Sequence, residues 1–500
     1  FISRRMALAG GGAVLAAAGA GIAWQAGWFG SGSRANSIAV MPFANLSGDP
    51  GKAYFSDGVA AEVRTQLSRN PRLAVVAQTS SQLLRGDDFD AKAIARKLGV
   101  SYLLDGNVRA AGSQFRIAAE LIDGETGFSL WSQQFDRPAA DVFAVQDEIA
   151  GAVTSALDSR LFGGPAPIGL RAGGGTDNVA AHDAFFKGSY LYGLARDEAS
   201  DRAALQAFDA AIASDPAYGL AHASRSLVLT VIGNLYLKAQ SRRDSFAAAM
   251  QAAQSAVSLS PSCAEAHSAL GFAIMNGQLN VRMARAAYEK SAELGQGDAN
   301  VLARYAIFQA RAGRFDAARG AASRAGQLDP LNARTAWLKG EIALGARRYA
   351  DAIPPVQQAL SINPDISVAR FVLGTAKLFL GDLPGAQAAY VAEPSSLFHL
   401  TGMAIINQRQ GKDAAARAAL QKLVAEHGDN GLYQQAQVAA SWGQPDLALA
   451  LLEKGYAAGD AGMMYALGDP FLDTLRKLPP FEKLLLRLGF DAVSTPEERT

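Results

Sequence analysis

The sequence predicts an α/β domain followed by a long all-α array of paired helices, with one apolar segment in front of them. Three observations support this prediction. No charged side chain occurs between residues 6 and 33. Short apolar runs alternate with amphipathic stretches between residues 37 and 162. Beyond residue 179, prolines and small residues recur with a period of about 34 positions.

The composition excludes several classes of protein. Of the 500 residues, 49% are hydrophobic and 19% charged, which suffices for packed cores and excludes a wholly disordered chain. Lys+Arg 47 balance Asp+Glu 46, so the chain lacks the excess of basic residues expected of a nucleic-acid-binding protein. The single cysteine, Cys263, excludes an internal disulfide framework and a multi-cysteine metal site, and we interpret it as a small buried residue.

The apolar segment at residues 6–29 is predicted to be a transmembrane or signal-anchor helix, because about 20 apolar residues span a bilayer. Arg4 and Arg5 precede it. The positive-inside rule therefore makes residues 1–5 a cytoplasmic stub and places the bulk of the chain outside the cytoplasm. Two alternatives stay open: a cleaved secretory signal with the small residues 18–20 at its cleavage site, and a buried helix.

After a linker at residues 30–36, residues 37–162 are predicted to form the α/β domain. Apolar runs indicate strands and 3.6-residue periodicity indicates helices, in the order β-α-β-α-β-β-β-α. The expected strands lie near 37–43, 73–76, 101–108, 115–122 and 128–135, and the expected helices near 55–69, 90–98 and 141–161. Asn45, Ser47 and Asp49 follow the first strand as turn formers, with a ligand-binding loop as the alternative.

A Gly/Pro-rich linker at residues 163–178 precedes the helical array, which is predicted over residues 179–490 with a tail at 491–500. Proline recurs at the ends of repeats, with Gln296 in its place in the third repeat, and small residues allow close helix contacts in a small-large-small pattern. The prolines are Pro216, Pro261, Pro330 and Pro364. The small-large-small sets are Ala204, Phe208 and Ala211; Ala318, Ala322 and Ala325; and Ala352, Val356 and Ala359. Glycines recur in the first helices, at 188, 271, 340 and 374, and in the turns, at 313, 381, 411 and 443.

This pattern resembles seven or eight tetratricopeptide repeats (TPRs), helix–turn–helix units that stack into a superhelix. Two further departures are expected. Pro354-Pro355 should delay or kink the second helix of its repeat, and about 11 inserted residues lie around 235–245. The ending, residues 468–476 and 480–485, is interpreted as a cap for the exposed apolar face of the last repeat.

The resemblance implies a concave surface lined by first helices, where a protein or peptide partner would bind. The repeat register places eight candidate contacts there, for each of which ordinary packing or solvation is the alternative: Asn300, Arg304, Arg311, Arg334, Trp337, Glu341, Phe371 and Phe379. The carboxylate-binding variant of the family is not indicated, because Ala303, Ile307 and Trp337 occupy its Asn and Lys positions.

Residues 38–50 (IAVMPFANLSGDP) resemble the opening strand and loop of the TolB N-terminal-like domain, as do residues 54–58, 93–100, 104–109 and 130–132. This resemblance implies a bacterial signalling or transcription-regulating protein in which the domain stands between a membrane segment and a TPR array. It also implies a winged-helix DNA-binding, nucleotide-cyclase or TIR module upstream of Phe1. It assigns no catalytic or ligand-binding residue.

No phosphate-binding Walker loop, Gly-x-Ser-x-Gly elbow or His-Glu-x-x-His motif occurs in the sequence. We therefore expect no catalytic, cofactor-binding or metal-ligating residue, and no cofactor. The predicted function is a non-catalytic interaction and sensing region, anchored in the bacterial inner membrane with its bulk in the periplasm. The alternative is an exported TPR scaffold or assembly factor without a cytoplasmic effector.

Overall fold

The computed structural model describes residues 34–48, 53–68, 70, 73–84, 90–111, 114–138, 142–161, 174–194 and 197–491. The chain divides into two compact units, Phe1–Ile168 and Gly169–Thr500. The expected stub and membrane segment, residues 1–29, lie outside the described residues. Among the helices that are described, none is both long enough and apolar enough to cross a bilayer.

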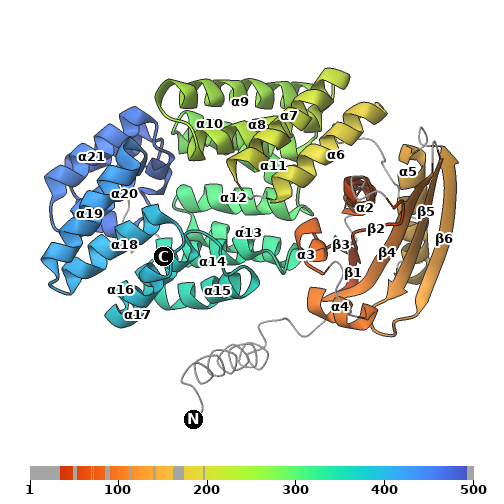
Figure 1. Ribbon diagram of the computed structural model, residues 1–500, viewed down its shortest axis with the longest axis horizontal. Coiled ribbons are helices and arrows are strands. Elements are labelled where there is room, and N and C mark those ends of the chain that lie inside the picture. The colour runs from red at the N-terminus through yellow and green to blue at the C-terminus, as the bar shows by residue number, and fades with distance from the viewer. Residues whose placement is uncertain are drawn as a thin grey trace, which may run out of the picture. The chain divides into compact units, whose positions relative to one another are not determined.

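The first unit is built on a mixed six-stranded sheet with the order β3-β1-β4-β5-β6, and β2 also pairs with β4 (Figure 1). The β1 strand runs parallel to β3 and β4, whereas β4, β5 and β6 form an antiparallel meander. The mixed sheet follows the order expected from the sequence, apart from the short β2. The bounds are β1 Arg34–Val40, β2 Ala44–Asn45, β3 Ala74–Val75, β4 Val100–Ala111, β5 Gln114–Asp123 and β6 Ser129–Pro138.

Two helices, α2 (Ala53–Ser68) and α5 (Val142–Leu161), contribute to one buried core with the sheet. Their apolar stripes at four-residue spacing supply Val59, Val63 and Leu67 from α2 and Ile149 and Val153 from α5, all fully buried. The short helices α3 and α4 complete this unit, at Gln78–Gln82 and Ala91–Leu98.

Local signals define α4 as the sequence predicts. The Asp90 carboxylate accepts a hydrogen bond from the Ala93 amide at 2.7 Å, as an N-cap does, and Gly99 ends the helix with φ 66°.

The second unit is a long helical array in which sixteen described helices form eight consecutive pairs joined by short turns (Figure 1). They are α6 Val179–Leu194, α7 Glu198–Ser214, α8 Gly219–Leu235, α9 Ala239–Leu259, α10 Ala264–Gly277, α11 Val281–Leu294, α12 Ala299–Arg311, α13 Phe315–Leu328, α14 Ala333–Gly345, α15 Tyr349–Ile362, α16 Ala369–Phe379, α17 Leu383–Val391, α18 Ser396–Arg409, α19 Asp413–His427, α20 Leu432–Ser441 and α21 Pro445–Ala458. The array ends with η3 Gly428–Gly431 between α19 and α20, and with η4 Ala461–Tyr465, η5 Pro470–Leu475 and α22 Pro479–Arg487 after α21.

The predicted small residues hold the helices of each pair together. A Cβ added to any of four first-helix glycines would come within 3.0 Å of the second helix: Gly188 against Phe208, Gly271 against Tyr288, Gly340 against Val356 and Gly374 against Tyr390. The turn glycines 313, 381, 411 and 443 all have φ between 72° and 84°, where a side chain is unfavourable. These features identify the array as TPR-like from its own geometry.

The expected delayed start of the helix that contains Pro354-Pro355 is wrong, and the inserted residues extend existing helices. The α15 helix begins at Tyr349 and continues through Pro354 and Pro355 to Ile362, so the prolines do not delay its start. The insertion lengthens two helices: α8 and α9 have 17 and 21 residues, whereas α12 and α13 have 13 and 14.

Replacing Ala322 with leucine is expected to destabilise the array by about 1–3 kcal/mol. Ala322 is fully buried between α12, α13 and α14, where it shares a cluster with Ala306, Ala318 and Leu338, so added methylenes must displace packed neighbours. Urea unfolding followed by circular dichroism measures the effect. The control is Arg314→Ala, a partly exposed site that should stay within about 0.5 kcal/mol. Equal effects at the two sites would contradict the packing.

Candidate functional site

The predicted groove residues lie on α12, α14 and α16, and several of them contact the chain's own C-terminal segment. We define this segment as residues 461–476, which include η4 and η5. Its buried side chains Met463, Met464, Leu472 and Leu475 belong to one core with residues of α10, α11, α12, α20 and α21. The segment therefore packs against helices that lie more than a hundred positions earlier in the sequence.

Arg311 and Glu341 form a buried ion pair between α12 and α14. The Arg311 Nη1 atom lies 2.5 Å from Glu341 Oε1, and the two side chains are only 7% and 11% exposed. The guanidinium carbon of Arg311 lies 3.4 Å from the ring centroid of Tyr465 in η4, which places a cation directly on an aromatic face. Both groups are thus satisfied within the chain, so they are not open positions on an unoccupied groove.

Phe371 and Phe379 on α16 meet Phe471 of the C-terminal segment. The ring centroids of Phe371 and Phe379 lie 6.3 and 5.5 Å from that of Phe471, in tilted arrangements favoured by aromatic pairs. Phe379 also stacks on Tyr349 of α15 with a centroid distance of 4.9 Å. The aromatic positions expected to receive a partner are therefore packed against an aromatic residue of the same chain.

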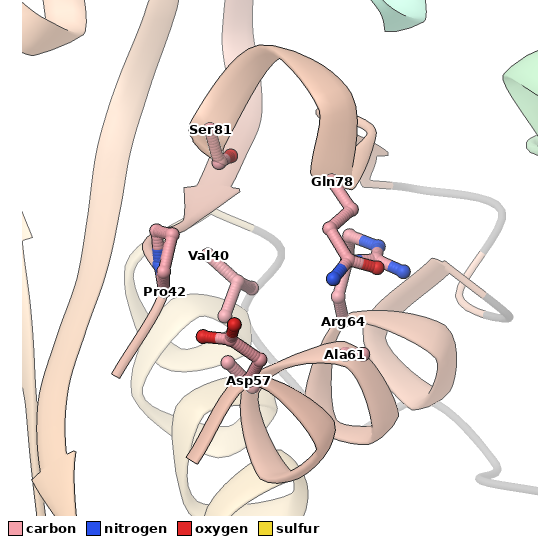
Figure 2. A pocket seen from close by; sticks show the side chains of 8 residues that line it. Val40, Pro42, Asp57, Ala61, Arg64, Gln78 and Ser81 are labelled. Atoms are coloured by element: carbon pink, nitrogen blue, oxygen red, sulfur yellow. The ribbon is translucent and has the colours of Figure 1, made fainter. Parts of the chain in front are cut away.

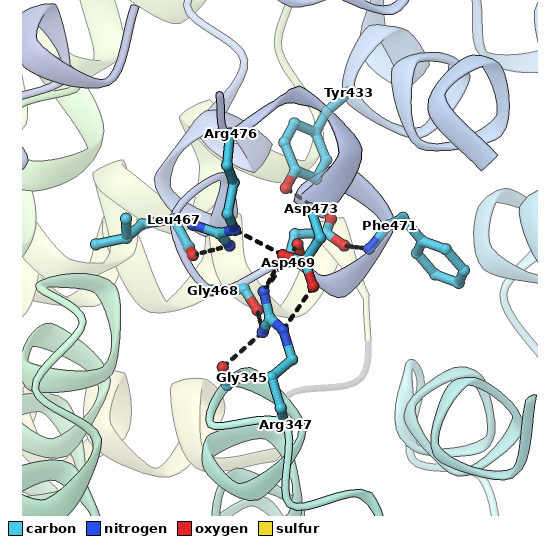
Figure 3. Close-up of polar contacts among 9 residues, drawn as sticks. All are labelled: Gly345, Arg347, Tyr433, Leu467, Gly468, Asp469, Phe471, Asp473 and Arg476. Carbon is cyan, nitrogen blue, oxygen red and sulfur yellow. Dashed lines mark hydrogen bonds and ion pairs between the residues drawn. The ribbon is translucent and has the colours of Figure 1, made fainter. Parts of the chain in front are cut away.

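Asp469 is the polar centre of the C-terminal segment. Its carboxylate accepts hydrogen bonds from the Tyr433 hydroxyl at 2.8 Å and the Phe471 backbone amide at 2.9 Å (Figure 3). It also accepts one from the side-chain amide of Gln437 at 2.6 Å. Burial raises the pKa of Asp469, while these hydrogen bonds and the positive charge of Arg347 oppose the rise. Tyr433 and Gln437 lie on α20, the first helix of the last pair, so the segment is fixed to the inner helices of the array.

Arg347, in the turn between α14 and α15, hydrogen-bonds several groups of the C-terminal segment. Figure 3 shows its guanidinium among carbonyl and carboxylate oxygens from both sides. Nη1 donates to the carbonyls of Gly345 and Gly468 at 2.6 Å, and Nε donates to the Asp473 carboxylate at 2.8 Å. Arg476 donates to the same carboxylate at 2.6 Å. The planar fork of an arginine suits this bidentate, multi-acceptor contact.

The backbone at Arg347 is held in a conformation that normally requires glycine. Its φ is 63°, at the turn position that glycines 313, 381, 411 and 443 occupy in other repeats. A non-glycine residue there costs about 1–2 kcal/mol. Leu279, at the same position of the α10–α11 turn, has φ 48° and packs in the core that contains Leu488 and Phe490. Both departures from glycine thus occur where the turn contacts the C-terminal part of the chain.

The remaining predicted residues are more accessible. Asn300 and Arg334 are exposed, whereas Arg304 and Trp337 are half-buried. Arg334 acts electrostatically on Asp201 of α7. The accessible part of the predicted surface therefore lies on α12 and α14.

Sequence reasoning treated the ending of the chain only as a cap. In the structure the ending packs against α20 and α21, and it also binds earlier helices: the Val281 amide donates to the Leu488 carbonyl at 3.0 Å, and Arg285 pairs with Asp491 at 2.8 Å. The alternation of acidic and aromatic residues at Asp469, Phe471 and Asp473 was the available signal for this role.

The α/β unit contains a small hollow at the end of β1, lined by Val40, Asp57, Gln78 and Ser81 among others (Figure 2). It encloses roughly the space of one water molecule, too little for an organic ligand. The Asn45 side chain, which follows β1 in the sequence, accepts a hydrogen bond from the Ser47 amide at 3.0 Å, which is ordinary turn chemistry. Among the residues that the structure covers, no group of acidic, histidine or cysteine side chains is arranged to hold a metal ion.

No family model matches the chain. The chain is 36% identical over 239 residues to a Rhizobium meliloti protein named "Putative adenylate cyclase 3"; the matched part is 48% of this chain and 40% of that protein. The chain thus spans less than half the length of this relative.

Similar solved structures include a human IFIT1 dimer and a TPR protein of Thermus thermophilus. The IFIT1 dimer is 14% identical with a TM-score of 0.42, covering 64% of this chain and 81% of that one. The Thermus protein is 18% identical with a TM-score of 0.33, covering 40% of this chain and all of the other.

Proposed function

We propose that the chain is the non-catalytic interaction and sensing region of a bacterial signalling protein, with its TPR-like array as the binding element. The observation that supports this most is the partial homology to the protein named "Putative adenylate cyclase 3". The sequence resemblance to the TolB N-terminal-like domain followed by TPRs agrees with it. Any cyclase or other effector activity would belong to parts of such a protein outside the residues described here.

The partner is proposed to bind the accessible part of the inner face, formed by Asn300, Arg304, Arg334 and Trp337 on α12 and α14. Arginine and tryptophan are the side chains that most often dominate binding energy at protein interfaces. The buried pair Arg311 and Glu341 is excluded from this role, because each already satisfies the other.

Site-specific photocrosslinking tests this proposal. A photoreactive amino acid at position 334 is expected to capture a defined partner protein in native membranes. The control is the same residue in place of Lys422, which is exposed on α19, the second helix of its pair. Capture of the same proteins from both positions, or from neither, would contradict a binding site on the inner face.

The proposed location is the inner membrane, with the bulk of the chain in the periplasm. It rests on Arg4 and Arg5 before the uncharged run at residues 6–29. Alkaline phosphatase fused after Thr500 should be active, and a fluorescent protein that matures only in the cytoplasm should stay dark. The opposite pattern would overturn the topology. A mature protein that lacks residues 6–20 by mass would favour the exported scaffold.

A further inference from the structure

The inner face of α14, α16 and α20 carries the features of a peptide-binding site that is already occupied. Three kinds of contact hold the C-terminal segment: Asp469 to Tyr433 and Gln437, Phe471 to the aromatic side chains of α16, and Asp473 to Arg347. Each receptor side chain belongs to a helix or turn of the repeats, and each ligand side chain lies within five consecutive residues.

The segment does not continue the repeat pattern. It consists of two short 3₁₀ turns, η4 and η5, whose local hydrogen bonds are made within the segment or with the residue just before it, as from Met463 to Asp460 and from Leu472 to Asp469. Gly459, with φ 70°, ends α21 before it, and Pro479-Pro480 begin α22 after it, so the segment is separate from both helices. The segment therefore has the form of an inserted ligand rather than of another repeat.

The backbone of the array is strained at Arg347, the turn residue that hydrogen-bonds the C-terminal segment. Arg347 adopts a left-handed backbone conformation at a position where four other turns have glycine, and its guanidinium reaches the segment from there. Strain of this kind persists only when surrounding contacts compensate for it. The Asp473 side chain, which pairs with Arg347, lies at the edge of the contact between the segment and the array, since it is 38% exposed.

We infer that this face of the array recognises segments with an acidic–proline–aromatic–x–acidic pattern, and that residues 469–473 of the chain are its resident ligand, which a partner carrying the same pattern displaces. This inference rests on the proposed function in that the array binds partner proteins, and it adds a second surface on α14, α16 and α20 beside the accessible one on α12 and α14. In the absence of such a partner, residues 469–473 occupy the binding face of the array.

A labelled peptide tests the inference on the full chain. The probe is a fluorescent peptide with the sequence of residues 468–476, and the control peptide has alanine in place of both aspartates and the phenylalanine. The wild-type chain should bind the probe weakly, because its own segment competes. Asp473→Ala weakens that competitor at the exposed rim, and the affinity for the probe should rise about tenfold.

Adding Arg347→Ala to this variant removes a receptor residue and should abolish the gain. The exposed control Asp413→Ala should bind as the wild type does. Circular dichroism verifies that each variant is folded. Failure of folded Asp473→Ala to bind the probe more tightly, or equal binding with Arg347→Ala added, would overturn the inference.

A second measurement needs no variant. Saturating unlabelled peptide added to the wild-type chain should accelerate hydrogen exchange at the backbone amides of residues 468–476, because the resident segment is released. Unchanged exchange would overturn displacement. Neither result depends on capture at position 334, so failure here is distinguishable from failure of the proposed function.

Discussion

Glu341→Ala is expected to lower the free energy of unfolding of the array by about 3–5 kcal/mol, because it leaves a buried arginine without its counter-charge. Burial lowers the pKa of Arg311, but the Glu341 carboxylate more than offsets this and holds that pKa above its ordinary value. The guanidinium also lies on the Tyr465 ring, so it has no path to water without local disruption. Urea unfolding of the purified chain measures the loss.

Two controls separate charge burial from side-chain truncation. Glu289→Ala removes an exposed carboxylate 3.8 Å from Arg314 and should cost no more than about 0.5 kcal/mol. The double replacement Arg311→Met with Glu341→Leu should recover most of the lost stability, because apolar residues often substitute for a buried ion pair without penalty. A small effect of Glu341→Ala alone would mean that water reaches Arg311.

The second large effect is expected at Asp469. Asp469→Ala removes the acceptor for the Tyr433 hydroxyl and the Gln437 amide, both buried, and should cost about 3 kcal/mol at neutral pH. The matched control is Asp446→Ala, at an exposed position in the first turn of α21. Its effect should stay below about 1 kcal/mol, the value of a favourable helix-dipole contact. Equal losses would contradict the burial of Asp469.

The Asp469 effect has a defined pH dependence. Burial raises the pKa of Asp469 in the folded state above its ordinary value of 3.8. The hydrogen bonds account for the contribution of this carboxyl at neutral pH. The additional, pH-dependent stability that follows from its raised pKa is fully present below the unfolded-state pKa and is lost as pH rises through the folded-state pKa. The stability difference between the wild type and Asp469→Ala should widen as pH is lowered from about 7 toward 4. A difference that narrows would contradict the raised pKa.

Features set by local sequence were predictable. Asp90 and Gly99 delimit α4, and glycines 313, 381, 411 and 443 mark the repeat turns, because each acts through its own backbone or its immediate neighbours. The small residues of helix pairs were predictable for a related reason. A repeat of about 34 residues brings the same positions together in every unit.

Features set by distant contacts were not predictable. The repeat register places Arg347 at a turn position that is glycine in other repeats, but it does not show what compensates for an arginine there, because the contacts come from Gly468 and Asp473, more than 120 positions later. The register placed Arg311 and Phe371 on α12 and α16 for a partner, but it could not identify the chain's own ending as what covers them. Pro354 and Pro355 are the opposite case. The local sequence favours an interrupted helix there, but α15 continues through both prolines.

Hydrogen exchange of the full chain, without any added peptide, tests most directly whether the C-terminal segment, residues 461–476, is docked on the inner face of the array. The amides of Met463, Gly468 and Leu472 are hydrogen-bonded within the docked ending, and the Val281 amide bonds to Leu488. We expect residues 461–476 to be protected to the same extent as α12, with a free peptide of the same sequence as the unprotected reference. Exchange of residues 461–476 at the rate of the free peptide, while α12 stays protected, would contradict the account.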